Sequence, residues 1–251
     1  MSEIKKSTEG SELKEDLSNY NADTYKKPSV TVDLLICTIL NDELNLLLIK
    51  RKYPPFKDHW ALPGGFVDID REETLEQTAN RELEEETGLK GIFVSQLKSY
   101  GDPRRDPRLR VITVAYYALV PYGKIPYGKI RAQDDAKEVA WFSLERLVHP
   151  HFSEEKKPLA FDHKIIITDL LKHLRDKMSV SPIAFELVPE KFTWPNLQKV
   201  YEIVLGKKLV APNFRQLIKA RYKIVEESSQ KKGKTGRPAR FLTYCGTKKV
   251  F

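Results

Sequence analysis

The stretch that most constrains this chain is GGFVDIDREETLEQTANRELEEETGL, residues 64–89, which joins a Gly-Gly pair to a dense acidic run. If the run is helical, Glu82, Glu85 and Glu86 stand at i, i+3 and i+4 and share one face, while Glu84 points elsewhere. Two carboxylates roughly 5 Å apart in a cleft repel by about 3 kcal/mol at an effective dielectric of about 20. A cation on that face would remove this cost. A solvated acidic helix is the alternative, and the cluster alone leaves both open.

Length and composition define the general class of protein. The chain has 251 residues, 41% of them hydrophobic and 31% charged, which suits one large globular domain or two ordinary ones. No apolar run approaches the roughly 18 residues of a membrane span, so we expect no membrane partner. Residues 1–27 lack the apolar core of a signal peptide and are expected to form a flexible tail of a cytoplasmic protein. Cys37 and Cys245 show no metal-type spacing and fit a reducing compartment.

Charge is distributed unevenly along the chain. Residues 180–251 hold 15 Lys and Arg against 5 Glu, a net charge of +10, so the remaining residues carry −2 of the total of +8. This asymmetry predicts a second domain that meets a polyanion. A solubilising basic tail is the alternative, but a tail would lack the apolar periodicity that this segment has.

The first 180 residues alternate apolar strand patterns with helical ones, which predicts an α/β domain with a mixed sheet and helices packed against it. Two runs rich in Val, Ile and Leu flank Asn41 and Asp42 and predict a β-hairpin. A helix is expected over 73–87, ended by Gly88, and another over 163–177. Further strands are expected at 92–99, 110–120 and 137–142. The repeat PYGKIPYGKI, residues 121–130, is predicted to be a loop.

The C-terminal third predicts two helices and a basic hairpin, the outline of a winged helix-turn-helix. After a linker at 181–191, Thr193 is the expected N-cap of the first helix and Gly206 its end. The second helix lies in PNFRQLIKARY. Its inward residues are predicted to be Phe214, Leu217 and Ile218, and its outward ones Arg215, Lys219 and Arg221.

Residues 64–89 resemble the Nudix box, G-x5-E-x7-R-E-U-x-E-E-x-G-U with U apolar. The second half matches in full, at Glu73, Arg81, Glu82, Leu83, Glu85, Glu86, Gly88 and Leu89. Seven residues instead of five separate Gly65 from Glu73. The resemblance implies a Nudix fold in which Glu82, Glu85 and Glu86 bind Mg²⁺ or Mn²⁺ and activate water at a diphosphate. It also implies that Arg81 pairs with Glu73 and that Gly64 and Gly65 let the backbone approach phosphates.

Other polar residues are weaker candidates. Arg105 and Arg108, in the arginine-rich loop GDPRRDPRLR, are predicted nucleotide contacts, with a solvated turn as an equal alternative. Glu138 is a candidate general base on a loop. Asp162 and His163 are expected to open the following helix, with the histidine in a structural role. His149 and His151 are expected in loops.

A Nudix-like domain followed by a winged helix is similar to the NrtR-type Nudix-related transcriptional regulators. The resemblance rests on FTWPNLQKVYEIVLGKKLVAPNFRQLIK, GRPARF, WALPGGFV, RDPR and PLAFDH, and runs from about residue 28 to 247. It implies a Nudix domain at 28–180, a DNA-binding domain at 192–251 and a homodimer on palindromic operator DNA. The implied effector is ADP-ribose or a related nucleotide, or arabinose in some members. The expected DNA contacts are Arg215, Lys219, Arg221, Lys231, Lys232, Lys234, Arg237 and Arg240.

Two functions follow from this resemblance. The main one is a nucleotide-sensing repressor whose Nudix domain also hydrolyses ADP-ribose. The alternative is a Mg²⁺-dependent pyrophosphatase, converting ADP-ribose to AMP and ribose 5-phosphate, with an accessory basic domain. The complete set of acidic residues favours hydrolysis, and the basic second domain favours DNA binding.

Overall fold

The computed structural model describes residues 21, 24–125, 136–150, 152, 158–228 and 240–247. Most of the predicted tail at 1–27, the second half of the PYGKI repeat, His151 and the wing residues Lys231, Lys232, Lys234 and Arg237 lie outside the described residues. Over the part of the chain that is described, no helix has the length and apolar character needed to cross a membrane.

The predicted hairpin is confirmed. Strand β1 (Ser29–Leu40) and strand β2 (Glu43–Arg51) pair in antiparallel fashion. Asn41 and Asp42 connect them with positive φ angles of 49° and 64°, the conformation that two-residue hairpin turns require. Both strands are buried along most of their length, because helices cover both faces of the sheet.

The sheet has seven strands and is mixed, as expected. Its main order is β3 (Trp60–Ala61), β2, β1, β6 (Val111–Leu119) and β5 (Phe93–Tyr100). In addition, β4 (Gly64–Phe66) pairs with β1, and β7 (Ala136–Ser143) pairs with β2. Strands β1 and β6 run parallel, and the other pairs are antiparallel.

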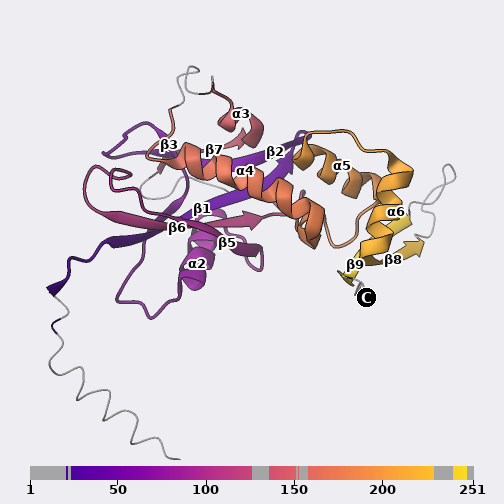
Figure 1. Cartoon of the computed structure of the whole chain (residues 1–251), viewed down its shortest axis with the longest axis horizontal. Coiled ribbons are helices and arrows are strands. Elements are labelled where there is room, and N and C mark those ends of the chain that lie inside the picture. Colours follow the sequence, from indigo (N-terminus) through magenta and orange to yellow (C-terminus); the bar gives the residue numbers. More distant parts are fainter. Residues whose placement is uncertain are drawn as a thin grey trace, which may run out of the picture.

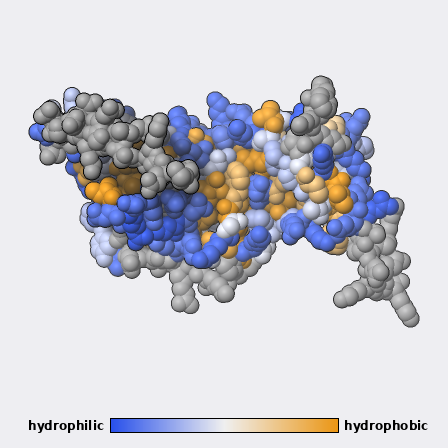
Figure 2. All heavy atoms as spheres, turned by 90° about the horizontal axis from the view of Figure 1, so that it is seen from below, coloured by the Kyte–Doolittle hydropathy of each residue, from blue (hydrophilic) through white to orange (hydrophobic). Residues whose placement is uncertain are grey.

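Helices form a layer on each side of this sheet (Figure 1). Helix α2 (Leu75–Thr87) packs Ala79 and Leu83 against one face, and α4 (His163–Val180) covers the other with the short α3 (Leu144–Val148). Helix α2 begins after Thr74, which forms a capping box with Gln77, and ends at Gly88 in the left-handed conformation. Figure 2 shows the molecule from below, where hydrophilic side chains predominate and hydrophobic ones form patches.

The C-terminal part is a winged helix. It contains α5 (Trp194–Leu205), α6 (Ala211–Arg221) and the antiparallel hairpin of β8 (Tyr222–Ser228) and β9 (Arg240–Thr247). Thr193 caps α5 and Gly206 ends it, as predicted. Phe214 and Ile218 are buried, but the predicted inward position of Leu217 is wrong. Leu217 is 45% exposed. Phe214 and Ile218, which are four residues apart, lie one above the other on the buried side of α6, and Leu217 lies beside this narrow stripe.

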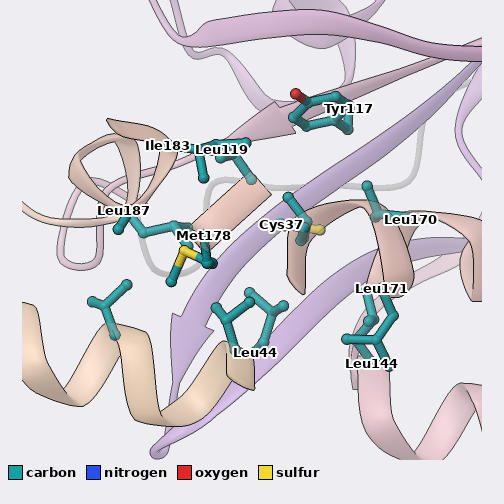
Figure 3. Close-up of a cluster of buried hydrophobic side chains, with 14 of the residues drawn as sticks. Cys37, Leu44, Tyr117, Leu119, Leu144, Leu170, Leu171, Met178, Ile183 and Leu187 are labelled. Carbon is teal, nitrogen blue, oxygen red and sulfur yellow. The ribbon is translucent and has the colours of Figure 1, made fainter. Parts of the chain in front are cut away.

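The segment predicted to be a linker is instead a packed element. Residues 182–187 form a 3₁₀ helix, η3 (Pro182–Leu187), whose apolar side chains are buried. These side chains belong to a hydrophobic core that extends from the face of the sheet covered by α4 to helices α5 and α6. Figure 3 shows part of this core, where Ile183 and Leu187 lie near Leu119 and Met178. The two halves of the chain therefore share one hydrophobic interior.

Candidate functional site

The acidic face of α2 is organised around Arg81. Its Nε donates to Glu73 Oε2 at 3.1 Å, and its Nη1 donates to Glu82 Oε1 at 2.9 Å and to Glu85 Oε2 at 3.0 Å. The predicted Arg81–Glu73 pair is confirmed despite the longer spacing from Gly65. A turn closed by Arg71 and Asp68, whose side chains pair at 3.1 Å, accommodates extra length in this loop. The loop is thus held against the helix.

Glu86 differs from its neighbours because its carboxylate has an incomplete set of partners. Its Oε2 is buried and accepts no hydrogen bond from the residues that the structure describes. Burial raises the pKa of Glu86 to about 7, and the charges of Glu82 and Glu85 add to the shift. Burial also raises the pKa of Glu82, although Arg81 opposes the change. The crowding of carboxylates predicted from sequence is therefore present.

The carboxylates of α2 have the donor chemistry that a divalent cation requires. Glu82 and Glu85 turn toward Arg81, so within the described ranges no three acidic, His or Cys side chains already stand as a ligand group. Their oxygens, together with the orphaned oxygen of Glu86, are nevertheless the hard donors that Mg²⁺ and Mn²⁺ prefer. A cation would also offset the burial cost that raises the pKa of Glu86.

The two glycines before α2 bring the backbone against these carboxylates. Gly64 has φ of +139°, and a Cβ there would lie 2.1 Å from the carbonyl oxygen of Val32, so a larger residue would disrupt the β4–β1 pairing. At Gly65 a Cβ would lie 3.5 Å from Glu82 Oε1. The glycine pair therefore marks the border between the acidic face and the cavity beside it.

That cavity has a volume of about 270 Å³. Its lining includes Gly64 and Gly65 and also residues that the sequence patterns missed, among them Thr31, Arg51, Tyr53 and Phe66. The Thr31 hydroxyl is buried and makes no hydrogen bond to any described residue. Tyr53 and Phe66 are 52% and 45% exposed, so aromatic rings are available to a ligand. The cavity also contains all four residues predicted from sequence to contact the nucleotide, Gly64, Gly65, Arg105 and Arg108.

The two predicted nucleotide-binding arginines have different environments. Arg105 is a correction to the prediction, because its side chain is 4% exposed and already occupied. It donates to Asp162 at 2.8 and 3.0 Å and to Asp33 at 3.2 Å, so it supports the cavity from below. Arg108 is more accessible, pairs with Asp106 at 2.8 Å and lies over the Phe66 ring at 5.6 Å.

The remaining Nudix candidates are structural. His163 opens α4 and is buried; its Nδ1 accepts a hydrogen bond from the Leu62 backbone at 2.9 Å, which places the ring proton on Nε2. Burial lowers the pKa of His163, so the ring is neutral. Glu138, the candidate general base, lies in β7, within the strand expected at 137–142; it pairs with Lys50 at 3.5 Å and is not part of the cavity lining. His149 follows α3 in a loop, as expected.

Among the residues that the structure describes in the winged helix, the predicted cations differ in their contacts. Arg215 and Lys219 are exposed on α6 and lie over the Trp194 ring at 5.9 and 5.4 Å. Arg221 is exposed, as predicted, and its Nη1 donates to the Ser179 carbonyl at the end of α4; its contact with DNA stays a prediction. Arg240 is the first residue of β9 and the first described residue after positions 229–239.

Comparisons with known proteins agree with this architecture. The model of the NUDIX domain matches residues 31–167, and that of the NrtR DNA-binding winged helix domain matches residues 184–243. A protein of Acinetobacter baylyi named ADPR responsive transcriptional repressor NtrR is 34% identical over 91% of this chain and 87% of its own length. An ADP-ribose pyrophosphatase of Methanocaldococcus jannaschii is 41% identical over 63% of this chain and 81% of its own length.

A solved structure resembles both halves together. The crystal structure of Shewanella oneidensis NrtR complexed with a 27mer DNA is 32% identical, has a TM-score of 0.70 and covers 86% of this chain and 93% of its own. The similarity thus extends from the sheet through η3 to the wing. The chain belongs to the Nudix family, in the group whose Nudix domain is followed by an NrtR-type winged helix domain.

Proposed function

We propose that this protein is a transcriptional repressor that releases operator DNA when it binds ADP-ribose, and that its Nudix site also hydrolyses the nucleotide. The observation that carries the proposal is that one chain holds both a complete acidic Nudix face on α2 and a basic helix α6 in a winged helix, and that α4 of the Nudix half shares a hydrophobic core with α5 and α6. The names of the Acinetobacter and Methanocaldococcus relatives support ADP-ribose as the ligand, and the Shewanella complex supports DNA. Two copies on a palindromic operator are part of the proposal.

The site suggests how the ligand would lie. A cavity of about 270 Å³ is at the small end for ligand pockets, so the nucleotide would extend from it past Gly65 to the acidic face of α2. Glu82, Glu85 and Glu86 would hold a Mg²⁺ or Mn²⁺ ion there. Such an ion, when bound, neutralises diphosphate charge and lowers the pKa of water. Arg81 orients two of the carboxylates and ties Glu73 to them.

Helix α4 provides a direct link between the nucleotide cavity and the DNA-binding half. At its start, His163 lines the cavity and Asp162 binds Arg105. At its end, the Ser179 carbonyl accepts from Arg221 of α6, and the Ser181 carbonyl accepts from the Tyr222 hydroxyl at 2.8 Å. A ligand that shifts the start of α4 would therefore displace α6.

Saturating ADP-ribose is expected to weaken operator binding by about 5- to 150-fold, the usual range of coupling between two sites. The linkage is reciprocal, so operator DNA must weaken ADP-ribose binding by the same factor. Gel-shift titrations of the Glu85→Gln protein, with and without ADP-ribose, measure the first effect without consuming the ligand. Unchanged operator affinity, with calorimetry confirming that ADP-ribose is bound, would reject this ligand as the effector and favour the pyrophosphatase alternative.

Arg215→Ala is expected to lower DNA affinity and leave ADP-ribose hydrolysis unchanged, because Arg215 lies exposed on α6, far in sequence from the Nudix residues. If Arg215 contacts a phosphate, the slope of log affinity against log salt should become shallower by about 0.9. Arg104→Ala, which removes the same charge from a side chain 91% exposed in the Nudix domain, is the control. An equal loss of affinity in both variants would show that only net charge matters.

A further inference from the structure

Glu226, on β8, contacts residues of three other elements of the winged helix. Its Oε1 lies 2.9 Å from Nζ of Lys219 on α6, and its Oε2 lies 3.7 Å from Nη1 of Arg240 on β9. The hydrogen bond from Lys219 is the main cause that lowers the pKa of Glu226, with further contributions from the Trp194 side chain and Arg240. One carboxylate thus contacts the second helix, both strands of the wing and the start of α5.

These contacts contribute little to folding stability. Ion pairs at the protein surface are weak because solvent screens them, and the Lys219 and Arg240 side chains are 58% and 65% exposed. The contacts matter more for the position of the two cations. A free Lys or Arg side chain loses rotamer entropy when it is held in one conformation, and a contact made before binding bears part of that loss. Glu226 holds both cations before DNA arrives.

The same residues form an ordered basic surface. Lys219 lies between the Glu226 carboxylate and the face of the Trp194 ring, and Arg215 lies over that ring too. The Lys219 ammonium group has three donors and the Arg240 guanidinium five, so contact with one carboxylate uses only part of the donor capacity of each cation.

We propose that Glu226 is a positioning residue of the DNA-binding surface, which acts by holding Lys219 and Arg240 at a set spacing between α6 and the wing. The inference rests on the proposed DNA-binding function and adds to it a residue of the opposite charge. Glu226 acts through the two cations, so it needs no contact with DNA itself.

Simple electrostatics makes the opposite prediction. A carboxylate beside DNA repels phosphates, so its removal should raise affinity. The adjacent residue of β8 provides a matched control, because Glu227 pairs with Lys191 at 2.6 Å and its side chain is 49% exposed. Glu226→Gln and Glu227→Gln change the net charge by the same amount at neighbouring positions. They differ in that Glu227 holds neither Lys219 nor Arg240.

The test uses the full-length chain and a DNA duplex selected from a randomised pool by the unmutated protein. Glu226→Gln is expected to weaken binding about tenfold and to make the salt slope shallower by about 0.9 for each cation that no longer contacts phosphate. Glu227→Gln is expected to bind as tightly as the unmutated protein or more tightly. Affinity of Glu226→Gln at or above that of the unmutated protein would overturn the inference, as would an equal loss in both variants.

A double-mutant cycle separates positioning from a general effect on the fold. Adding Lys219→Met to Glu226→Gln should cost less affinity than Lys219→Met costs alone, because part of the action of Glu226 passes through Lys219. Strictly additive losses would contradict this, and thermal unfolding of each variant identifies any that fail to fold. If the unmutated protein selects no duplex, the proposed function fails first, a result distinct from altered affinity in the variants.

Discussion

Glu86→Gln is expected to reduce ADP-ribose hydrolysis by roughly 10²–10³-fold or more and, at the same time, to stabilise the metal-free fold. The loss of activity follows from removing one of three carboxylates proposed to hold the cation. The gain in stability follows from the burial of Glu86, whose Oε2 finds no hydrogen-bond donor among the described residues. An isosteric amide carries no charge to bury.

The stability effect of Glu86 has a defined pH window. An unfolded chain releases this proton near pH 4.5, the ordinary pKa of a glutamate, whereas burial keeps it on the folded protein until about pH 7. Below pH 4.5 both states are protonated, and Glu86 costs nothing. As pH rises from about 4.5 to 7 the folded state loses stability, by up to about 3 kcal/mol. Glu86→Gln should lack this part of the pH dependence.

Urea unfolding in EDTA between pH 4 and pH 9 measures the stability effect, and AMP release with Mg²⁺ or Mn²⁺ measures hydrolysis. Glu84→Gln is the matched control, because Glu84 is on the same helix but is 45% exposed and pairs with Lys90. It should change neither measurement. Mg²⁺ should raise the unfolding temperature of the unmutated protein more than that of Glu86→Gln. If the unmutated protein hydrolyses no nucleoside diphosphate derivative with either metal, only the sensing role remains.

Arg105→Met is expected to destabilise the protein by about 3–5 kcal/mol at neutral pH, because it leaves two buried carboxylates without their shared cation. Asp33 and Asp162 have side chains only 12% and 13% exposed and both bind Arg105. The destabilisation should appear as a urea midpoint below that of the unmutated protein.

Urea unfolding at neutral pH tests the role of Arg105. Arg104→Met removes the adjacent arginine, whose side chain is 91% exposed, and should change stability by no more than about 0.5 kcal/mol. If Arg105→Met keeps normal stability but binds ADP-ribose less tightly, then Arg105 is a nucleotide contact, as predicted from sequence, and not a support for the cavity.

Local features were predictable because their causes lie within a few residues. The turn at Asn41 and Asp42, the end of α2 at Gly88 and the start of α5 at Thr193 each depend on backbone conformation or on a partner three residues away. The acidic face of α2 was predictable for the same reason, since helix periodicity alone brings its glutamates together. The pair of Arg81 with Glu73 followed from resemblance to the Nudix box, and the structure confirms it.

Features that depend on distant partners were not predictable. Arg105 was expected to bind a nucleotide, but the carboxylates that occupy it lie 57 and 72 residues away in sequence. Residues 182–187 were expected to form a linker, but two layers of the fold converge on them and bury them. Arg221 is exposed, as expected, but its hydrogen bond to the Ser179 carbonyl, 42 residues away in sequence, depends on the position of the end of α4.

The sequence by itself therefore determined which chemistry this protein carries: an acidic face for a cation, a glycine loop for close approach and a basic helix for DNA. Those depend on residue type and short spacing. The tertiary structure decided which cations are free and which are already paired, because burial and ion pairing depend on what the folded chain brings within a few ångströms. It also decided that Leu62 of the cavity lining lies in the same hydrophobic core as α5 and α6, which gives the proposed coupling a physical route.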